Sequence, residues 1–99
     1  MSKPVRLVKQ SDGKTSTRVD VEITEEGHLL FSGQDVGEAP AACFGDEDYE
    51  YWLKVDAEQK DRVLLALIEK LFAGNRSVIL ELKGLFDAKD IPSEFLSYV

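Results

Sequence analysis

The chain has 99 residues, of which 43% are hydrophobic and 31% charged, and its formal net charge is −7. This is the size and composition of one ordinary globular domain, so we expect a single domain over residues 1–99, with one core and no room for large multi-substrate chemistry. No apolar run approaches the roughly 20 residues that cross a bilayer, and the N-terminus lacks an apolar leader, so we expect a cytoplasmic protein without a membrane partner.

The first third of the chain has the alternating pattern of strands. Apolar residues at Val5 and Leu7 indicate a short strand, and residues 11–13 suit a tight turn. Residues 17–24 alternate cleanly between apolar and polar, which is typical of a half-buried antiparallel strand. A turn at residues 25–27 leads into a third strand at residues 28–32, which predicts a three-stranded meander.

The middle of the chain is predicted to break this pattern and then to resume it. Glycines at Gly33 and Gly37 interrupt the strand pattern, and residues 38–44 are compatible with one or two helical turns. Residues 49–55 then form a fourth strand, with Tyr49 and Tyr51 on one face and Glu50 and Trp52 on the other. The pattern alone does not decide which of the two faces is exposed.

The last part of the chain is predicted to be helical. Asp56 and Gln59 have the spacing of a capping box, which begins a helix over residues 57–73 with a wide leucine-rich stripe. Gly74 ends that helix, and a second helix follows over residues 76–87. The apolar tail at residues 91–99 is expected to pack back on the core or on the sheet edge. We therefore predict an α+β fold: an antiparallel sheet of about four strands, a meander plus one, with two C-terminal helices packed on one face.

The negative charge is concentrated in one block. Between Val19 and Leu53 there are ten acidic residues and no lysine or arginine, whereas the other 64 residues carry a net charge of +3. Such a block disfavours direct binding of nucleic acid and favours a basic protein surface as partner. A solvated face that only keeps the protein in solution would have the same composition.

The sequence contains no recognisable catalytic, cofactor or metal site. There is one histidine, His28, and one cysteine, Cys43, and no serine lies in a nucleophile-elbow context. Acidic residues at positions 46, 48 and 50 follow the rhythm of a calcium-binding loop. However, the glycine that this loop requires is replaced by Tyr51 and its last acid by Ala57, which excludes an EF-hand. We therefore predict a protein that is not an enzyme and that needs no cofactor or metal.

Acidic and aromatic residues occur together at the start of the fourth strand, a composition found at protein-binding surfaces. The alternative is that these aromatics line the core. The residues we expect to contact a partner are Asp35, Glu38, Asp46, Glu47, Asp48, Glu50 and Trp52.

Several of these segments resemble a family of small bacterial proteins that has no established activity. The resemblance rests on GQDVG at residues 33–37, on GDEDYEYW at residues 45–52, on the leucine-rich helix that follows, and on Ile91-Pro92-x-Glu94-Phe95. It implies a compact bacterial domain and supplies no catalytic residues.

Two hypotheses about function follow from the sequence. The first is a non-enzymatic, immunity-type or inhibitor-like binding protein that masks a basic surface of a toxin, a nuclease or a nucleic-acid-binding complex. The second is an accessory or assembly protein that forms a homodimer, or docks a larger complex, through apolar surface on the helix at 57–73 or on the tail.

Overall fold

The structure is a computed structural model that describes residues 3–98. The chain divides into two compact units, Met1–Val63 and Leu64–Val99, and each is described by itself. The single domain expected from the length of the chain stays a prediction.

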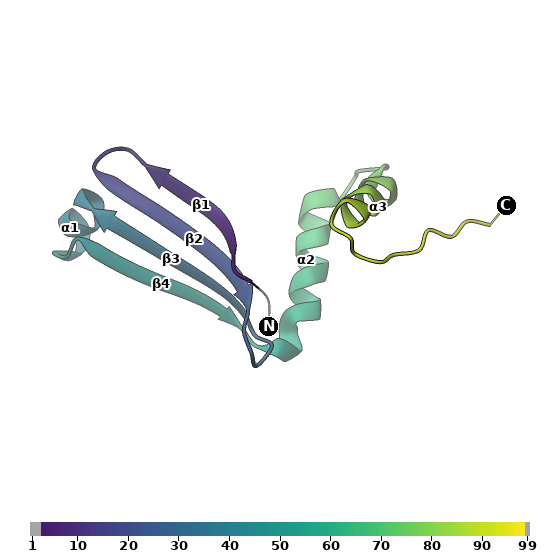
Figure 1. Cartoon of the computed structure of the whole chain (residues 1–99), viewed down its shortest axis with the longest axis horizontal. Helices are drawn as coiled ribbons and strands as arrows, with labels where there is room; N and C mark the ends of the chain where they lie inside the picture. Colours follow the sequence, from purple (N-terminus) through teal and green to yellow (C-terminus); the bar gives the residue numbers. More distant parts are fainter. Residues whose placement is uncertain (1–2, 99) are drawn as a thin grey trace. The chain divides into compact units, whose positions relative to one another are not determined.

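The first unit is built on one antiparallel sheet of four strands in the order β1-β2-β3-β4 (Figure 1). The strands are β1 (Val5–Ser11), β2 (Thr15–Ile23), β3 (Leu29–Gly37) and β4 (Asp48–Val55). The short helix α1 (Glu38–Phe44) connects β3 to β4. This arrangement confirms the predicted α+β class and the meander of three strands followed by a fourth.

The strand register divides the side chains of the sheet between two faces, because residues directly opposite each other on paired strands share a face. One row of partners is Val5, Val21, Phe31 and Leu53, and we call its side the apolar face. The next row is Arg6, Asp20, Ser32 and Trp52, on what we call the polar face. A bulge between Arg6 and Val8 in β1 keeps both valines of that strand on the apolar face.

Strand β3 is longer than predicted, because it continues through Gly33 to Gly37 instead of ending at Ser32. Gly33 pairs with Val19 on one side and with Tyr51 on the other. The ring of Tyr51 lies directly over it, so a Cβ atom built on Gly33 would come within 2.1 Å of a ring carbon. The glycine therefore makes room for a neighbouring aromatic side chain within the sheet and does not break the strand.

The start of β2 holds α1 in place. The Glu38 backbone N–H donates to the carbonyl of Lys14 at 3.0 Å, and the Ala39 N–H donates to the Thr15 hydroxyl at 2.9 Å. Gly37, just before α1, has a φ of 132°, and a Cβ there would lie 2.0 Å from the Lys14 carbonyl oxygen. Only glycine fits this approach, so the second glycine does mark the end of a strand, as predicted.

The predicted capping box at Asp56 is wrong. A 3-10 turn, η1 (Ala57–Gln59), precedes helix α2 (Lys60–Phe72), and the Asp56 side chain makes no capping hydrogen bond. The Ala57 N–H instead donates to Nδ1 of His28, 3.0 Å away. The Gln59 N–H, which the capping box assigns to the Asp56 side chain, donates to the Asp56 backbone carbonyl at 2.9 Å. Gly74, with a φ of 82°, follows α2 as the predicted left-handed stop.

Helix α3 (Val78–Ala88) lies in the second unit and begins two residues later than predicted. It ends in a Schellman motif, in which the Ile91 N–H donates to the Phe86 carbonyl and the Asp90 N–H donates to the Asp87 carbonyl. The position that this motif requires to be left-handed is Asp90, with a φ of 56°.

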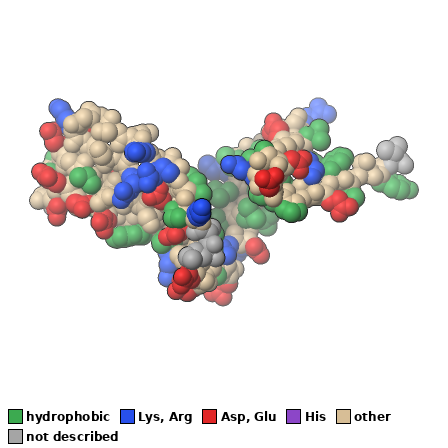
Figure 2. Space-filling view, viewed as in Figure 1, with side chains coloured by type: hydrophobic (Ala, Val, Ile, Leu, Met, Phe, Trp, Pro, Cys, Tyr) green, Lys and Arg blue, Asp and Glu red, His purple; other side chains and the backbone are tan. Residues whose placement is uncertain are grey.

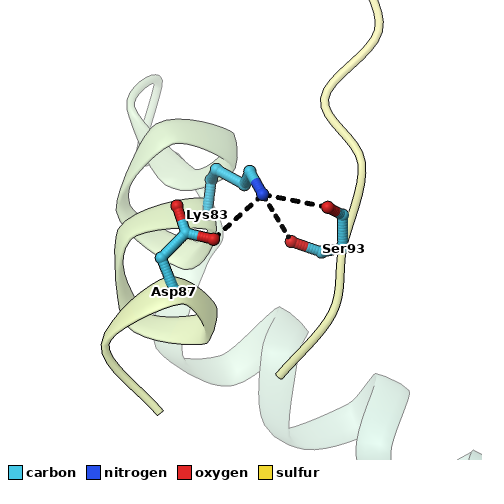
Figure 3. A network of polar contacts seen from close by, with 3 residues as sticks. All are labelled: Lys83, Asp87 and Ser93. Carbon is cyan, nitrogen blue, oxygen red and sulfur yellow. Dashed lines mark hydrogen bonds and ion pairs between the residues drawn. The ribbon is translucent and has the colours of Figure 1, made fainter. Parts of the chain in front are cut away.

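The tail after α3 is tied back to that helix at one point (Figure 3). The Lys83 ammonium donates to the Asp87 carboxylate at 2.9 Å, and to the backbone oxygen and the hydroxyl of Ser93 at 2.9 and 3.0 Å. Beyond this point Leu96 and Tyr98 are exposed. The tail is thus joined to α3 through Lys83 and Ser93, whereas its predicted packing on the core or on the sheet edge stays a prediction.

Apolar side chains are poorly covered in both units. Among the described residues, Gly33 and Pro40 are the buried ones, and no Val, Leu, Ile, Phe, Tyr or Trp is buried. The packing of the two C-terminal helices on one face of the sheet stays a prediction. No helix formed by the described residues has the length and apolar character needed to cross a membrane.

Candidate functional site

The candidate site is the polar side of β4, where three of the predicted contact residues follow one another. Asp48, Glu50 and Trp52 alternate along the strand and so share the polar face. All three are exposed, and Trp52 keeps 63% of its surface accessible. We call this set the β4 acidic face. Leu53, on the apolar side of the same strand, is 62% exposed, so exposure does not distinguish the two faces of β4.

Next to Trp52 the polar face is hollowed. A shallow hollow of about 210 Å³ is lined by Trp52 and Glu50 of β4, by Ser32 and Gln34 of β3 and by Arg18 and Asp20 of β2, with Gly33 beneath. The hollow lies over Ser32, whose side chain is small, whereas a side chain at Gly33 would point to the apolar face, against Tyr51. An aromatic wall with carboxylates on two sides suits a cationic side chain, which can stack on the indole and pair with Glu50.

The two acids that precede β4, Asp46 and Glu47, lie beside this site and also take part in hydrogen bonds with the backbone. The Asp46 carboxylate accepts a hydrogen bond from the Asp48 N–H at 3.0 Å. Glu47 accepts at its backbone carbonyl, from the Gly37 N–H at 2.7 Å. Both residues are exposed. They therefore extend the negative charge of the β4 acidic face beyond the end of the strand.

The remaining predicted contact residues are not brought into the site. Asp35 pairs with Tyr49 and lies on the apolar face, where its carboxylate accepts a hydrogen bond from the Tyr51 hydroxyl at 3.2 Å. Burial, followed by the nearby Asp35 carboxylate, raises the pKa of Tyr51 above its ordinary value of 10.0. Glu38 is exposed in the first turn of α1. Asp35 is thus a structural partner of Tyr51.

The structure adds residues that sequence reasoning missed. Arg18 of β2 donates to the Gln34 side-chain oxygen at 2.6 Å, and the Gln34 amide donates to Asp48 at 2.9 Å. This chain of hydrogen bonds crosses three strands and orients the Asp48 carboxylate. The only sequence signal for it is the polar position of each residue in its strand, and the strand register decides which of them meet.

Charge is unevenly distributed over the sheet. Lys and Arg side chains gather over the middle of the sheet, and Asp and Glu lie along the side where α1 and β4 run (Figure 2). The basic residues come from β1 and β2, outside the acidic block of the sequence. The sheet therefore presents a basic region and an acidic region next to each other.

The groups that could carry chemistry lie elsewhere. His28 accepts the Ala57 hydrogen bond at Nδ1 and lies 3.8 Å from the Asp56 carboxylate. Cys43 is an exposed free thiol in α1. Over residues 3–98, no group of three or more His, Cys, Asp or Glu side chains is arranged to hold a metal ion. The structure gives His28 a structural partner in the backbone of Ala57.

Comparison with protein-family models, with curated proteins and with solved structures finds no match to this chain. The resemblance to a family of small bacterial proteins accordingly stays a prediction.

Proposed function

We propose that this is a non-enzymatic binding protein that masks a basic surface of another protein, in the manner of an immunity protein or an inhibitor. The observation that carries the proposal is Trp52, a tryptophan that is 63% exposed beside Glu50 and at the rim of a hollow. Exposed tryptophans surrounded by charge are typical hot spots, and the acidic rim accelerates association with a basic partner.

The class of partner follows from the charges. A toxin, a nuclease or a nucleic-acid-binding complex carries the basic surface that this site would cover, whereas the net charge of −7 opposes direct contact with nucleic acid. We also propose a bacterial, cytoplasmic setting. It is supported by the resemblance at residues 45–52 and by the single cysteine, which suits a reducing compartment.

The test is a binding titration with two probes: a hexa-arginine peptide and the purified basic proteins encoded beside its gene. Trp52→Ala and Glu50→Lys should each weaken binding at least tenfold, and Glu50→Lys, which changes a charge, should also flatten the dependence of binding on salt. Glu69→Lys makes the same charge change on α2, which contributes no residue to the site, and should leave the affinity within twofold. Equal binding by wild type and both site variants would overturn the proposal.

A second function, self-assembly through apolar surface, is favoured by a separate observation. Leu64, Leu67 and Leu71 form a stripe along α2 and are 56%, 48% and 72% exposed. Side chains of this size in one stripe are typical of a surface that a partner covers, and we commit to a second copy of the chain as that partner.

Light scattering over a range of concentrations tests this second function. Wild type should shift from monomer to dimer as concentration rises, and Leu64→Lys should remain a monomer. A wild type that stays monomeric at millimolar concentration would contradict it.

A further inference from the structure

The polar face has a second hollow that lies toward β1 and away from the β4 acidic face. Its volume is about 510 Å³, and three of its lining residues are the cations Arg6, Lys9 and Arg18. Hydroxyls line it as well, from Ser11 and Ser16, whose oxygens are 3.3 Å apart. In a chain with a net charge of −7, this hollow collects positive charge.

The positive charge in the hollow is only partly compensated. Arg6 forms an ion pair with Asp20. Arg18 donates to the neutral amide oxygen of Gln34, and Lys9 has no hydrogen bond or ion pair with any described residue. Two of the three cations therefore lack a carboxylate partner within residues 3–98.

Those two cations lie directly opposite each other. Lys9 and Arg18 are register partners on β1 and β2, so their side chains extend from the same face. Like charges in directly opposite positions destabilise a pair of strands. A bound anion between them would remove this repulsion, and it would make the arrangement favourable in the occupied protein.

The donors match one chemical class of ligand. A guanidinium fork, an ammonium and two hydroxyls all donate hydrogen bonds, and Arg in particular binds carboxylate and phosphate oxygens in bidentate fashion. We propose that the hollow between β1 and β2 binds an oxyanionic small molecule, held by Lys9 and Arg18. With a volume of about 510 Å³, the hollow has room for an oxyanion that is one group of a small organic molecule.

The hollow shares Arg18 and Gln34 with the hollow beside Trp52, but the residues that carry the two proposals differ. Glu50 and Trp52 do not line the hollow between β1 and β2. Glu50→Lys should therefore leave the binding of anions intact, so that failure of one proposal does not imply failure of the other.

The test is an NMR titration of the ¹⁵N-labelled full chain with inorganic phosphate, glycerol phosphate and glutarate, at constant ionic strength against sodium chloride. Saturable shifts should appear at Lys9, Ser11, Ser16 and Arg18. A stronger response to glycerol phosphate than to glutarate would identify a phosphate ligand, and the reverse a carboxylate.

Variants separate a built site from general attraction. Lys9→Gln and Arg18→Gln should each weaken binding at least tenfold, whereas Lys54→Gln should have no effect. Lys54→Gln removes the same charge from strand β4. Lys54 is the register partner of Leu30 and does not line the hollow. Lys9 lies on the edge strand β1. Lys9→Gln therefore still tests the site if Arg18→Gln unfolds. Shifts that fail to saturate, that chloride reproduces, or that Lys54→Gln weakens equally would overturn the proposal.

Discussion

At the scale of single residues, Gly33 is a position at which the sheet has no room for a side chain. The Tyr51 ring covers it and donates from its hydroxyl to Asp35. We expect Gly33→Ala to displace the ring and to lower the free energy of unfolding by about 1–3 kcal/mol, as overpacking does. Urea denaturation measures this loss, and a tyrosine titration would show the pKa of Tyr51 falling toward 10.0.

Gly84 provides the matched control for that substitution. It lies inside α3, and a Cβ built on it would meet no atom within 4 Å. Gly84→Ala should therefore raise the free energy of unfolding by about 1 kcal/mol, because alanine is the better helix former. If Gly33→Ala and Gly84→Ala changed the free energy of unfolding in the same direction, contact with the Tyr51 ring would not be what limits substitution at Gly33.

Tyr51 also makes a prediction about pH. Its pKa is raised above 10.0 in the folded protein, so the folded state holds the phenol proton more tightly than the unfolded state. The stability that this contributes is complete below pH 10 and is lost as pH rises through the folded pKa. Above pH 10, the Tm of Tyr51→Phe should fall less than the Tm of wild type, as measured by thermal unfolding. Tyr98→Phe changes a fully exposed tyrosine and should behave as wild type does.

At the scale of elements, the end of α3 contains a correctable strain. Asp90 adopts a φ of 56° in the Schellman motif, a conformation that costs an L-residue energy and costs glycine little. Asp90→Gly should raise the stability of the helix end by roughly 1 kcal/mol, the usual cost of a left-handed residue. Amide exchange at Ile91, whose N–H closes the motif, reports this locally. Faster exchange in the variant would contradict the prediction.

The elements that the sequence predicted well are those with local signals. The alternation at residues 17–24 predicts β2, and Gly74 predicts the end of α2. Both signals, the two-residue period of a strand and a glycine in the left-handed conformation, depend on residues within one segment. The extension of β3 through Gly33 was missed because the reason for that glycine is Tyr51, which is 18 positions later in the chain. The capping acceptor at His28 was missed for the same reason, since it acts on Ala57.

The site was predictable to a similar degree. Alternation along residues 48–52 places Asp48, Glu50 and Trp52 on one face without any knowledge of the fold. The basic neighbours from β1 and β2 could not be predicted, because only the register places Arg18 beside Gln34 and Lys9 beside Arg18. Charge counting also could not show that Asp35 lies on the other face of the sheet, because it ignores the face on which a side chain lies.

At the scale of the whole molecule, the distribution of apolar surface links folding to assembly. Among the side chains that the structure describes, no large apolar one is buried, and Leu65, Leu71 and Leu80 are each about 70% exposed. Hydrophobic burial is the main favourable term in folding, at about 25 cal/mol for each Å² removed from water. Self-association would bury these apolar side chains, so the stability of the fold would depend on the formation of the dimer.

If a second copy of the chain covers the α2 stripe, stability must depend on protein concentration. A hundredfold increase in concentration then favours the folded dimer by about 2.7 kcal/mol, which corresponds to a rise in Tm of roughly 5–10 °C for a dimer of this size. Calorimetry at low and high concentration measures the shift. Leu71→Lys should abolish it, because a charge in the stripe opposes burial, whereas Glu69→Lys on the same helix should preserve it. A wild-type Tm that is independent of concentration would leave the β4 acidic face, and not the apolar stripe, as the surface through which the protein acts.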